Sequence, residues 1–260
     1  MPRFAANLST LYPEFPLLDR IEAAARDGFA AVEVQAPYEA PAPQWREALD
    51  VAGVPLVLLN SPRGKEASDR GLAALPGRQA EFETSIAVAL DYARTLNCRR
   101  VHVLAGCPPA EAPRDECRRT YLRNLDWACA LLRPHGITVT IEPLNGRDAP
   151  GYFLRTQEQA AQIIGESAQG KIGLQMDFYH LQTEEGDLTR RFERHLPLIA
   201  HLQIAGVPNR SEPDTGEIDY RHLFALIDRL GYRGWVGCEY RPVRGGAGGT
   251  SAGLGWMRVV

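Results

Sequence analysis

The sequence is poor in the residues that build disulfide frameworks, zinc clusters and nucleic-acid surfaces. It has five cysteines, an odd number with no C-x-x-C pair, and only six histidines among 260 residues. Its 32 acidic residues outnumber its 29 basic residues, which gives a formal net charge of −3. This cysteine pattern favours reduced thiols over disulfides or a cysteine zinc site. The chain has no excess of basic residues, which argues against a nucleic-acid partner.

Long apolar segments are also missing. The first fifteen residues, MPRFAANLSTLYPEF, contain no continuous apolar run of the kind that a signal peptide carries. Val54–Leu59, one of the longest apolar runs, is interrupted by Pro55 and is far too short to cross a bilayer. We therefore expect an unprocessed cytoplasmic protein that does not insert into a membrane.

Short apolar segments alternate with longer amphipathic segments along the whole chain, which is typical of repeated βα units around a parallel sheet. The predicted strands are Phe4–Leu8, Ala31–Gln35, Pro55–Asn60, Arg100–Ala105, Thr138–Glu142, Ile172–Asp177, His201–Ala205 and Trp235–Tyr240. The predicted helices are Leu17–Gly28, Glu81–Asn97, Arg118–Gly136, Thr156–Ser167, Asp187–Leu198 and Asp219–Gly231. Eight units favour a (β/α)8 TIM barrel, an α/β fold, as a single domain over residues 1–260.

Two glycine-rich segments depart from this alternation. SPRGKEASDRGLAALPGR, residues 61–78, is longer than an ordinary βα loop, so it either shapes a substrate pocket or is a tolerated surface insertion. The tail RGGAGGTSAGLGWMRVV, residues 244–260, predicts an abbreviated eighth helix and partial mobility.

Polar residues end four consecutive predicted strands, where the reactive groups of such barrels lie. They are Glu142, Asp177, Gln203 and Glu239. A buried carboxylate is costly unless it is paired or bound to a cation, so three that converge on one barrel mouth indicate a metal. An all-oxygen ligand set favours one Mg²⁺ or Mn²⁺ ion. Each residue taken alone could instead be an ordinary ion-pair or structural residue.

Three histidines lie near this constellation. His201 shares a strand face with Gln203, so we expect it to orient the site from one layer below. His180 either donates to a substrate oxygen or caps the following loop. His102 is either a substrate-binding residue or a satisfied core histidine.

The strand ends IEPLN, QMDFYHLQ and GCEYRP resemble the hydroxypyruvate isomerase family of xylose isomerase-like barrels. The resemblance extends to DRGLAALPGR, to HLQIAGVPNRSEPDTGEIDY and to GLGWM, and so covers almost the whole chain. It implies that Glu142, Asp177, Gln203 and Glu239 are metal ligands and that Glu142 and Glu239 also transfer the proton. Related ketose 3-epimerases usually carry histidine in place of Gln203. The resemblance also implies self-association.

The resemblance implies interconversion of hydroxypyruvate and 2-hydroxy-3-oxopropanoate (tartronate semialdehyde), which moves one hydrogen between adjacent carbons through an enediolate. We expect the cation to stabilise the developing charge and the two glutamates to act as acid and base. Because three carboxylates leave the site formally negative, an anionic substrate needs a further cation. Arg210 is the first candidate, ahead of Arg63, Lys65 and Arg241, for which a solvated surface role is the simpler interpretation.

Four other functions remain open. Two keep similar chemistry: isomerisation of a longer 2-oxo-tetronate, and 3-epimerisation of a ketose. A third is an abasic-site endonuclease, which relies on a histidine-rich zinc cluster and a basic groove that this composition fits poorly. The fourth is a non-catalytic metal-binding or sugar-binding barrel.

Overall fold

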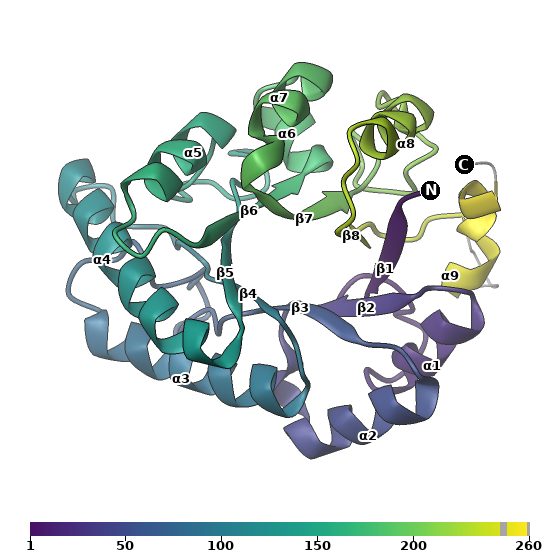
Figure 1. Cartoon of the computed structure of the whole chain (residues 1–260), viewed down its shortest axis with the longest axis horizontal. Helices are drawn as coiled ribbons and strands as arrows, with labels where there is room; N and C mark the ends of the chain where they lie inside the picture. The colour runs from purple at the N-terminus through teal and green to yellow at the C-terminus, as the bar shows by residue number, and fades with distance from the viewer. Residues whose placement is uncertain (245–248, 259–260) are drawn as a thin grey trace.

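A computed structural model describes residues 1–244 and 249–258. Eight parallel strands close into a barrel in the order β1 to β8, and β8 pairs with β1. Helices form a ring outside the strands (Figure 1). The strands are β1 (Arg3–Asn7), β2 (Ala31–Val34), β3 (Leu56–Asn60), β4 (Arg100–His102), β5 (Thr138–Ile141), β6 (Ile172–Asp177), β7 (Ile199–Ile204) and β8 (Trp235–Cys238). The predicted fold class is confirmed.

The strands form where the sequence is almost continuously apolar, because each strand is covered by helices on one face and by the barrel core on the other. Every residue of β2, β3, β6 and β8 is buried. All eight predicted strands overlap observed ones. The differences lie at the ends: β4 ends at His102, three residues earlier than predicted, and β7 begins two residues earlier than predicted, at Ile199.

The helices follow the strands in regular alternation. They are α1 (Asp19–Arg26), α2 (Ala42–Ala52), α3 (Gln79–Thr95), α4 (Arg114–Leu132), α5 (Gln157–Glu166), α6 (Phe178–Glu184), α7 (Leu188–His195), α8 (Tyr220–Arg229) and α9 (Gly249–Ala252). The six predicted helices are all present. Gly28 follows α1 with a φ of 93°, the left-handed conformation that a helix-ending glycine supplies.

The sequence pattern did not reveal α2. This helix begins at Ala42, directly after Pro41, and Pro43 lies in its first turn. Proline is tolerated there because the first backbone N–H groups of a helix have no partner inside the helix. Trp45 and Leu49 provide its buried face. Because few residues of this segment are apolar, the sequence pattern did not indicate that it forms an amphipathic helix.

Both glycine-rich segments contain buried side chains. Within residues 61–78, Leu72 and Leu75 are buried, and the Arg78 guanidinium donates to both Asp69 and Glu81. In the tail, α9 has four residues, which confirms an abbreviated helix. Trp256 in this part of the tail is buried against Phe4; the expected partial mobility stays a prediction. Residues 245–248 and 259–260 lie outside the described part of the chain.

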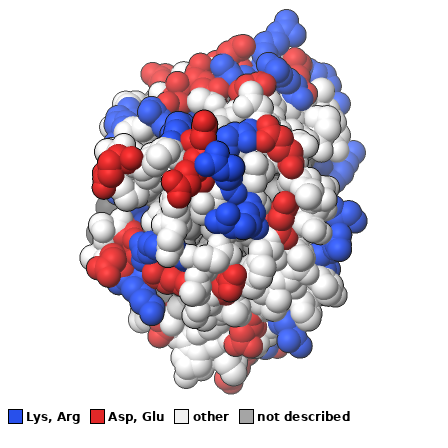
Figure 2. Space-filling model, turned by 90° about the vertical axis from the view of Figure 1, so that its left-hand side faces the viewer, with Lys and Arg blue, Asp and Glu red and all other residues white. Residues whose placement is uncertain are grey.

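The outer surface carries mixed charge. On the side drawn in Figure 2, acidic and basic side chains are interspersed, and no single broad basic field covers that side. All five cysteines have free thiols. Within the described residues, no helix is both long enough and apolar enough to span a membrane.

Candidate active site at the carboxyl ends of the strands

A cavity of about 770 Å³ opens at the end of the barrel where the strands terminate. Five of the predicted site residues line it, namely Glu142, Glu239, His102, His180 and Arg210. Asp177 and Gln203 are buried below this lining, with exposures of 0% and 1%. The loop after β3 contributes Arg63 and Arg70 to the wall, so at least part of that loop shapes the cavity. Lys65 is not among the lining residues.

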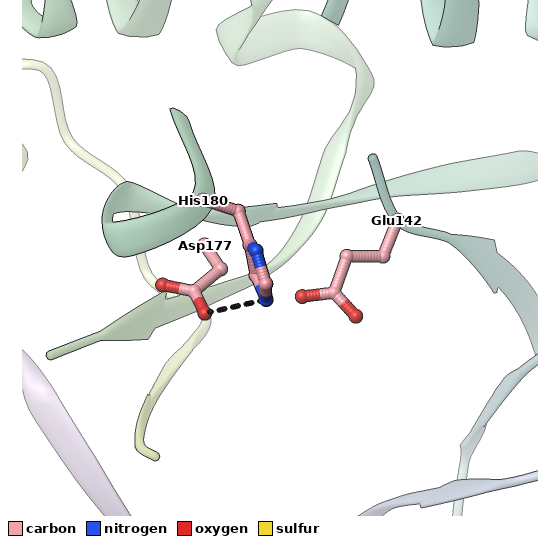
Figure 3. A group of neighbouring side chains, drawn as sticks. All are labelled: Glu142, Asp177 and His180. Atoms are coloured by element: carbon pink, nitrogen blue, oxygen red, sulfur yellow. Dashed lines mark ion pairs between the residues drawn. The ribbon is translucent and has the colours of Figure 1, made fainter. Parts of the chain in front are cut away.

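Glu142, Asp177 and His180 form a compact buried group. One potential ligand atom from each lies within 4.8 Å of the others. Glu142 directly follows β5, Asp177 ends β6, and His180 lies in the first turn of α6. Figure 3 shows the two carboxylates facing the His180 ring from opposite sides. The group could hold a metal ion.

Burial controls the protonation of the carboxyl groups. It raises the pKa of Glu142 well above its ordinary range, and the nearby Glu239 and Asp177 carboxylates raise it further. Burial raises the pKa of Asp177 to about 6 and that of Glu239 to about 7, although Arg210 opposes both shifts. Oε1 of Glu142 is buried and has no hydrogen-bond partner in the described part of the chain. Such an unsatisfied oxygen is suited to a cation or a substrate proton.

His180 presents a donor to the cavity. Its Nδ1 accepts the backbone N–H of Asn145 at 3.2 Å. Burial lowers the pKa of His180, and Arg210 lowers it further. A neutral ring that accepts at Nδ1 carries its proton on Nε2. Nε2 lies 3.8 Å from Oδ2 of Asp177, within the buried group.

His102 lies beside Glu142 rather than in an apolar core. Its Nδ1 is 3.4 Å from Oε2 of Glu142, and neither ring nitrogen has a hydrogen bond among the described residues. Burial, with a smaller effect of His201, lowers the pKa of His102 to about 3. The ring is therefore neutral and lines the cavity with an unused donor.

Arg210 brings a positively charged side chain to the site. Its Nη2 donates to Oε1 of Glu239 and, at 3.3 Å, to Oδ2 of Asp177. The guanidinium carbon also lies 4.9 Å from the centre of the Tyr179 ring. Burial alone would lower the pKa of Arg210, but the carboxylates of Glu239, Asp177 and Glu142 raise it above its ordinary value. Arg210 is thus charged and fixed at the cavity wall.

Gln203 contacts Glu239 through nitrogen. Its Nε2 lies 2.6 Å from Oε2 of Glu239, while its Oε1 accepts from Gln175 at 2.8 Å. In this orientation the amide oxygen faces away from the carboxylates. Metal ligation by Gln203 therefore requires its amide to turn over and stays a prediction.

Three polar residues of β1 and β2 complete the site and were not singled out from the sequence. Asn7 donates to Oε2 of Glu239 at 2.9 Å, and Gln35 donates to Oε1 at 2.9 Å. Glu33 lies below them and accepts from His201 at 2.6 Å. One signal was available: Glu33 places a charge inside the apolar run AVEV, and the strand period puts Gln35 on the same face.

Comparison with known proteins identifies the family. Residues 21–260 match the sequence model of the family described as xylose isomerase-like TIM barrel. This chain belongs to that family. The chain is 51% identical to a 2-oxo-tetronate isomerase of Cupriavidus necator, over 99% of this chain and 98% of the relative. It is 40% identical to the hydroxypyruvate isomerase of Escherichia coli, again over 99% of this chain and 98% of the relative.

A solved structure supports the same assignment. The protein from Brucella melitensis, described as an AP endonuclease of family 2, superposes with a TM-score of 0.95 at 43% identity. The superposition covers 100% of this chain and 99% of that one. Two isomerases are 51% and 40% identical to this chain over 99% of its length. This member of the xylose isomerase-like family is therefore an isomerase.

Proposed function

We propose that the protein isomerises a short 2-oxo-3-hydroxy acid by moving one proton between C3 and C2. The observation that carries the proposal is the convergence of Glu142, Glu239 and Asp177 beside one cavity, with Oε1 of Glu142 unsatisfied. Burial raises the pKa of all three carboxyl groups, so their charged forms are costly without a cation. A bound metal cation would compensate the negative charge of these carboxylates, and the substrate would then bind beside it.

The residues present fit a divalent metal ion. Glu142, Asp177 and Glu239 supply hard oxygen ligands, which favours Mg²⁺ or Mn²⁺. Ligation by Gln203 would break its contacts with Glu33 and Glu239, so we assign its amide to the support of Glu239. His180 has its Nε2 proton directed into the group, so we assign it to substrate binding rather than to metal ligation. When bound, the cation would act as a Lewis acid toward the substrate oxygens.

The side chains divide the remaining work. One of Glu142 and Glu239 removes the proton from C3, and the other returns a proton at C2, through an enediolate of the substrate. The proton of the C3 hydroxyl passes to the oxygen on C2, so that the C3 oxygen becomes the new carbonyl. His102 and His180 donate to substrate oxygens, and Arg210 neutralises the carboxylate of the acid.

Two substrates satisfy this chemistry. Hydroxypyruvate would be interconverted with 2-hydroxy-3-oxopropanoate (tartronate semialdehyde), and 2-oxo-tetronate with its 3-oxo isomer. The two differ by one hydroxymethyl group beyond C3. The cavity of about 770 Å³ is large enough for either the three-carbon or the four-carbon acid. Pockets of roughly 300–1,000 Å³ enclose whole small-molecule ligands. The 51% identity to a 2-oxo-tetronate isomerase favours the four-carbon acid.

Functions of other kinds receive less support. An abasic-site endonuclease needs a histidine-rich metal cluster, whereas the metal-ligand group found among the described residues contains one histidine. Ketose 3-epimerisation is disfavoured by Gln203, which replaces a usual histidine of those enzymes. We also propose a cytoplasmic location, which suits the five free thiols.

The test uses metal-stripped protein, to which Mg²⁺ or Mn²⁺ is returned in turn. Hydroxypyruvate and 2-oxo-tetronate are assayed side by side, with Glu142→Gln and Glu239→Gln as variants. We expect metal-dependent turnover that falls by at least about 10²-fold in both variants, the low end for general acid-base catalysis. Retention of more than a tenth of the activity in Glu239→Gln would remove Glu239 from the mechanism. Turnover of neither acid by wild-type protein that binds metal would contradict the proposed substrate class.

A further inference from the structure

Glu33 is the most deeply buried acidic residue near the site that the proposed mechanism does not use. Its side chain has no exposure, and it lies in the middle of β2. A charge in such a position is costly unless donors surround it. Three donors converge on it: Asn7 Nδ2 at 2.9 Å, Gln203 Nε2 at 2.8 Å and His201 Nε2 at 2.6 Å.

Two of these donors also reach Glu239. Nδ2 of Asn7 and Nε2 of Gln203 both lie against Oε1 of Glu33, and both lie against Oε2 of Glu239, at 2.9 and 2.6 Å. An amide NH₂ group carries two hydrogens, so each nitrogen can donate one to each carboxylate. Two amides thus bridge Glu33 to one oxygen of Glu239.

The orientation of these amides is fixed from several sides. The backbone N–H of Ser9 donates to Oδ1 of Asn7 at 3.0 Å, which turns Nδ2 toward the carboxylates. Gln203 has no such backbone partner in the described part of the chain. Its Nε2 is held by Glu33, a group that only accepts when ionised, while its Oε1 is met by Gln175 Nε2.

The barrel also leaves space for Glu33. Gly237 in β8 has no side chain, and a Cβ at that position would lie 2.3 Å from the Glu33 carboxylate oxygens. Gly237 therefore admits the carboxylate beneath Glu239, two residues further along the same strand face.

We propose that Glu33 is a positioning residue, which orients the Gln203 amide and, through Gln203 and Asn7, holds Glu239 in its working position. Glu33 contacts neither the cavity lining nor the reacting atoms. The inference deepens the proposed isomerase function and rests on it for the role of Glu239 as acid or base and metal ligand.

Glu33→Gln tests this role with little change in shape. A glutamine keeps a single acceptor oxygen and no charge, so either His201 or the two amides lose their acceptor, and any contact that remains to Asn7 and Gln203 is no longer charge-assisted. We expect kcat to fall about 10- to 100-fold with KM changed less than threefold, and Mn²⁺ affinity measured without substrate to fall about 10-fold, the range seen for groups that orient metal ligands.

A double-variant cycle separates positioning from a purely structural or long-range electrostatic effect. In a Glu239→Gln background, adding Glu33→Gln should change kcat and Mn²⁺ affinity less than threefold, because residues that act through one another are not additive. Equal losses in the wild-type and Glu239→Gln backgrounds would overturn the proposal, as would unchanged values in Glu33→Gln.

Gly237→Ala provides a second variant that keeps every charge. It displaces Glu33 sterically, and we expect the same loss of kcat and the same lack of additivity with Glu239→Gln; normal kcat and Mn²⁺ affinity in folded Gly237→Ala would contradict the proposal. The Mn²⁺ affinity is measured on the full-length, metal-stripped protein and needs no substrate. If wild-type protein turned over neither acid, the proposed function would fail while the Mn²⁺ cycle still decided the role of Glu33.

Discussion

The backbone N–H of Asn145 donates to Nδ1 of His180 across 3.2 Å, and this contact decides which nitrogen of the neutral ring carries the proton. Asn145, in the segment after β5, thereby determines the tautomer of His180 in α6. Nε2–H of His180 becomes a donor directed at the buried carboxylates and the cavity. The first prediction tests this donor.

Replacement of His180 by Phe should lower kcat/KM about 10²- to 10³-fold, the cost of removing one preorganised donor to a developing oxyanion. Metal affinity should stay within threefold, because His180 is assigned to substrate rather than to the ion. Steady-state kinetics and Mn²⁺ titration measure the two effects. The exposed His222 in α8 provides the control, and His222→Asn should leave both unchanged. A large loss of Mn²⁺ affinity in His180→Phe would instead make His180 a ligand.

Arg210→Ala should raise KM for the acid substrate by about 10- to 100-fold, which corresponds to the roughly 1.5–3 kcal/mol of a hydrogen bond to a charged group. Arg210→Lys should restore little, because Nη2 of Arg210 donates to Glu239 and Asp177 while Nε donates to the Glu239 carbonyl, and a lysine has a single nitrogen for all of these contacts. Substrate saturation curves measure the effect. Arg241→Ala is the matched comparison, since Arg241 lines the same cavity and is exposed. An unchanged KM in Arg210→Ala would exclude Arg210 as the carboxylate-binding residue.

Metal-stripped protein should lose stability as the pH rises. Acids whose pKa is higher in the folded than in the unfolded state favour folding most below their unfolded values of about 4. That contribution disappears as the pH passes the folded values of Asp177, about 6, and Glu239, about 7. We expect Tm to fall between pH 5 and pH 8, and added Mg²⁺ or Mn²⁺ to restore it mainly at the higher pH. Glu239→Gln should flatten this dependence, and a pH-independent Tm in metal-stripped wild-type protein would contradict it.

Trp256→Ala should destabilise the barrel by about 3–5 kcal/mol, the usual cost of removing a buried Trp or Phe. The indole packs edge-on against Phe4 and donates from Nε1 to the Tyr240 hydroxyl at 3.2 Å. Denaturant unfolding measures the change. Met257→Ala, at the half-buried neighbouring position, should cost less than half as much. Equal effects of the two substitutions would mean that the tail does not close the barrel as described.

The strand ends were predictable from sequence because each is a local event. A polar residue that follows an apolar run, such as Glu142 or Glu239, is visible without knowledge of its neighbours. The support beneath them was not predictable in the same way. Asn7, Glu33 and Gln203 meet only because β1, β2, β7 and β8 close with a particular register, which pairs Asn7 with Glu33 and Gln203 with Gly237. The packing of the tail was not predicted, because its glycines obscured one buried residue, Trp256.

The pairing of β1 with β8 also has a consequence for synthesis. Asn7 and Glu239 are separated by 232 residues, and β8 is the last strand to be made. Until β8 docks, the nascent sheet has two open edges, which are templates for unwanted pairing with other chains. The event that removes those edges is the same one that brings Glu239 beside Asn7. A chain arrested before closure would therefore be both aggregation-prone and inactive, and recovery of turnover would report barrel closure directly.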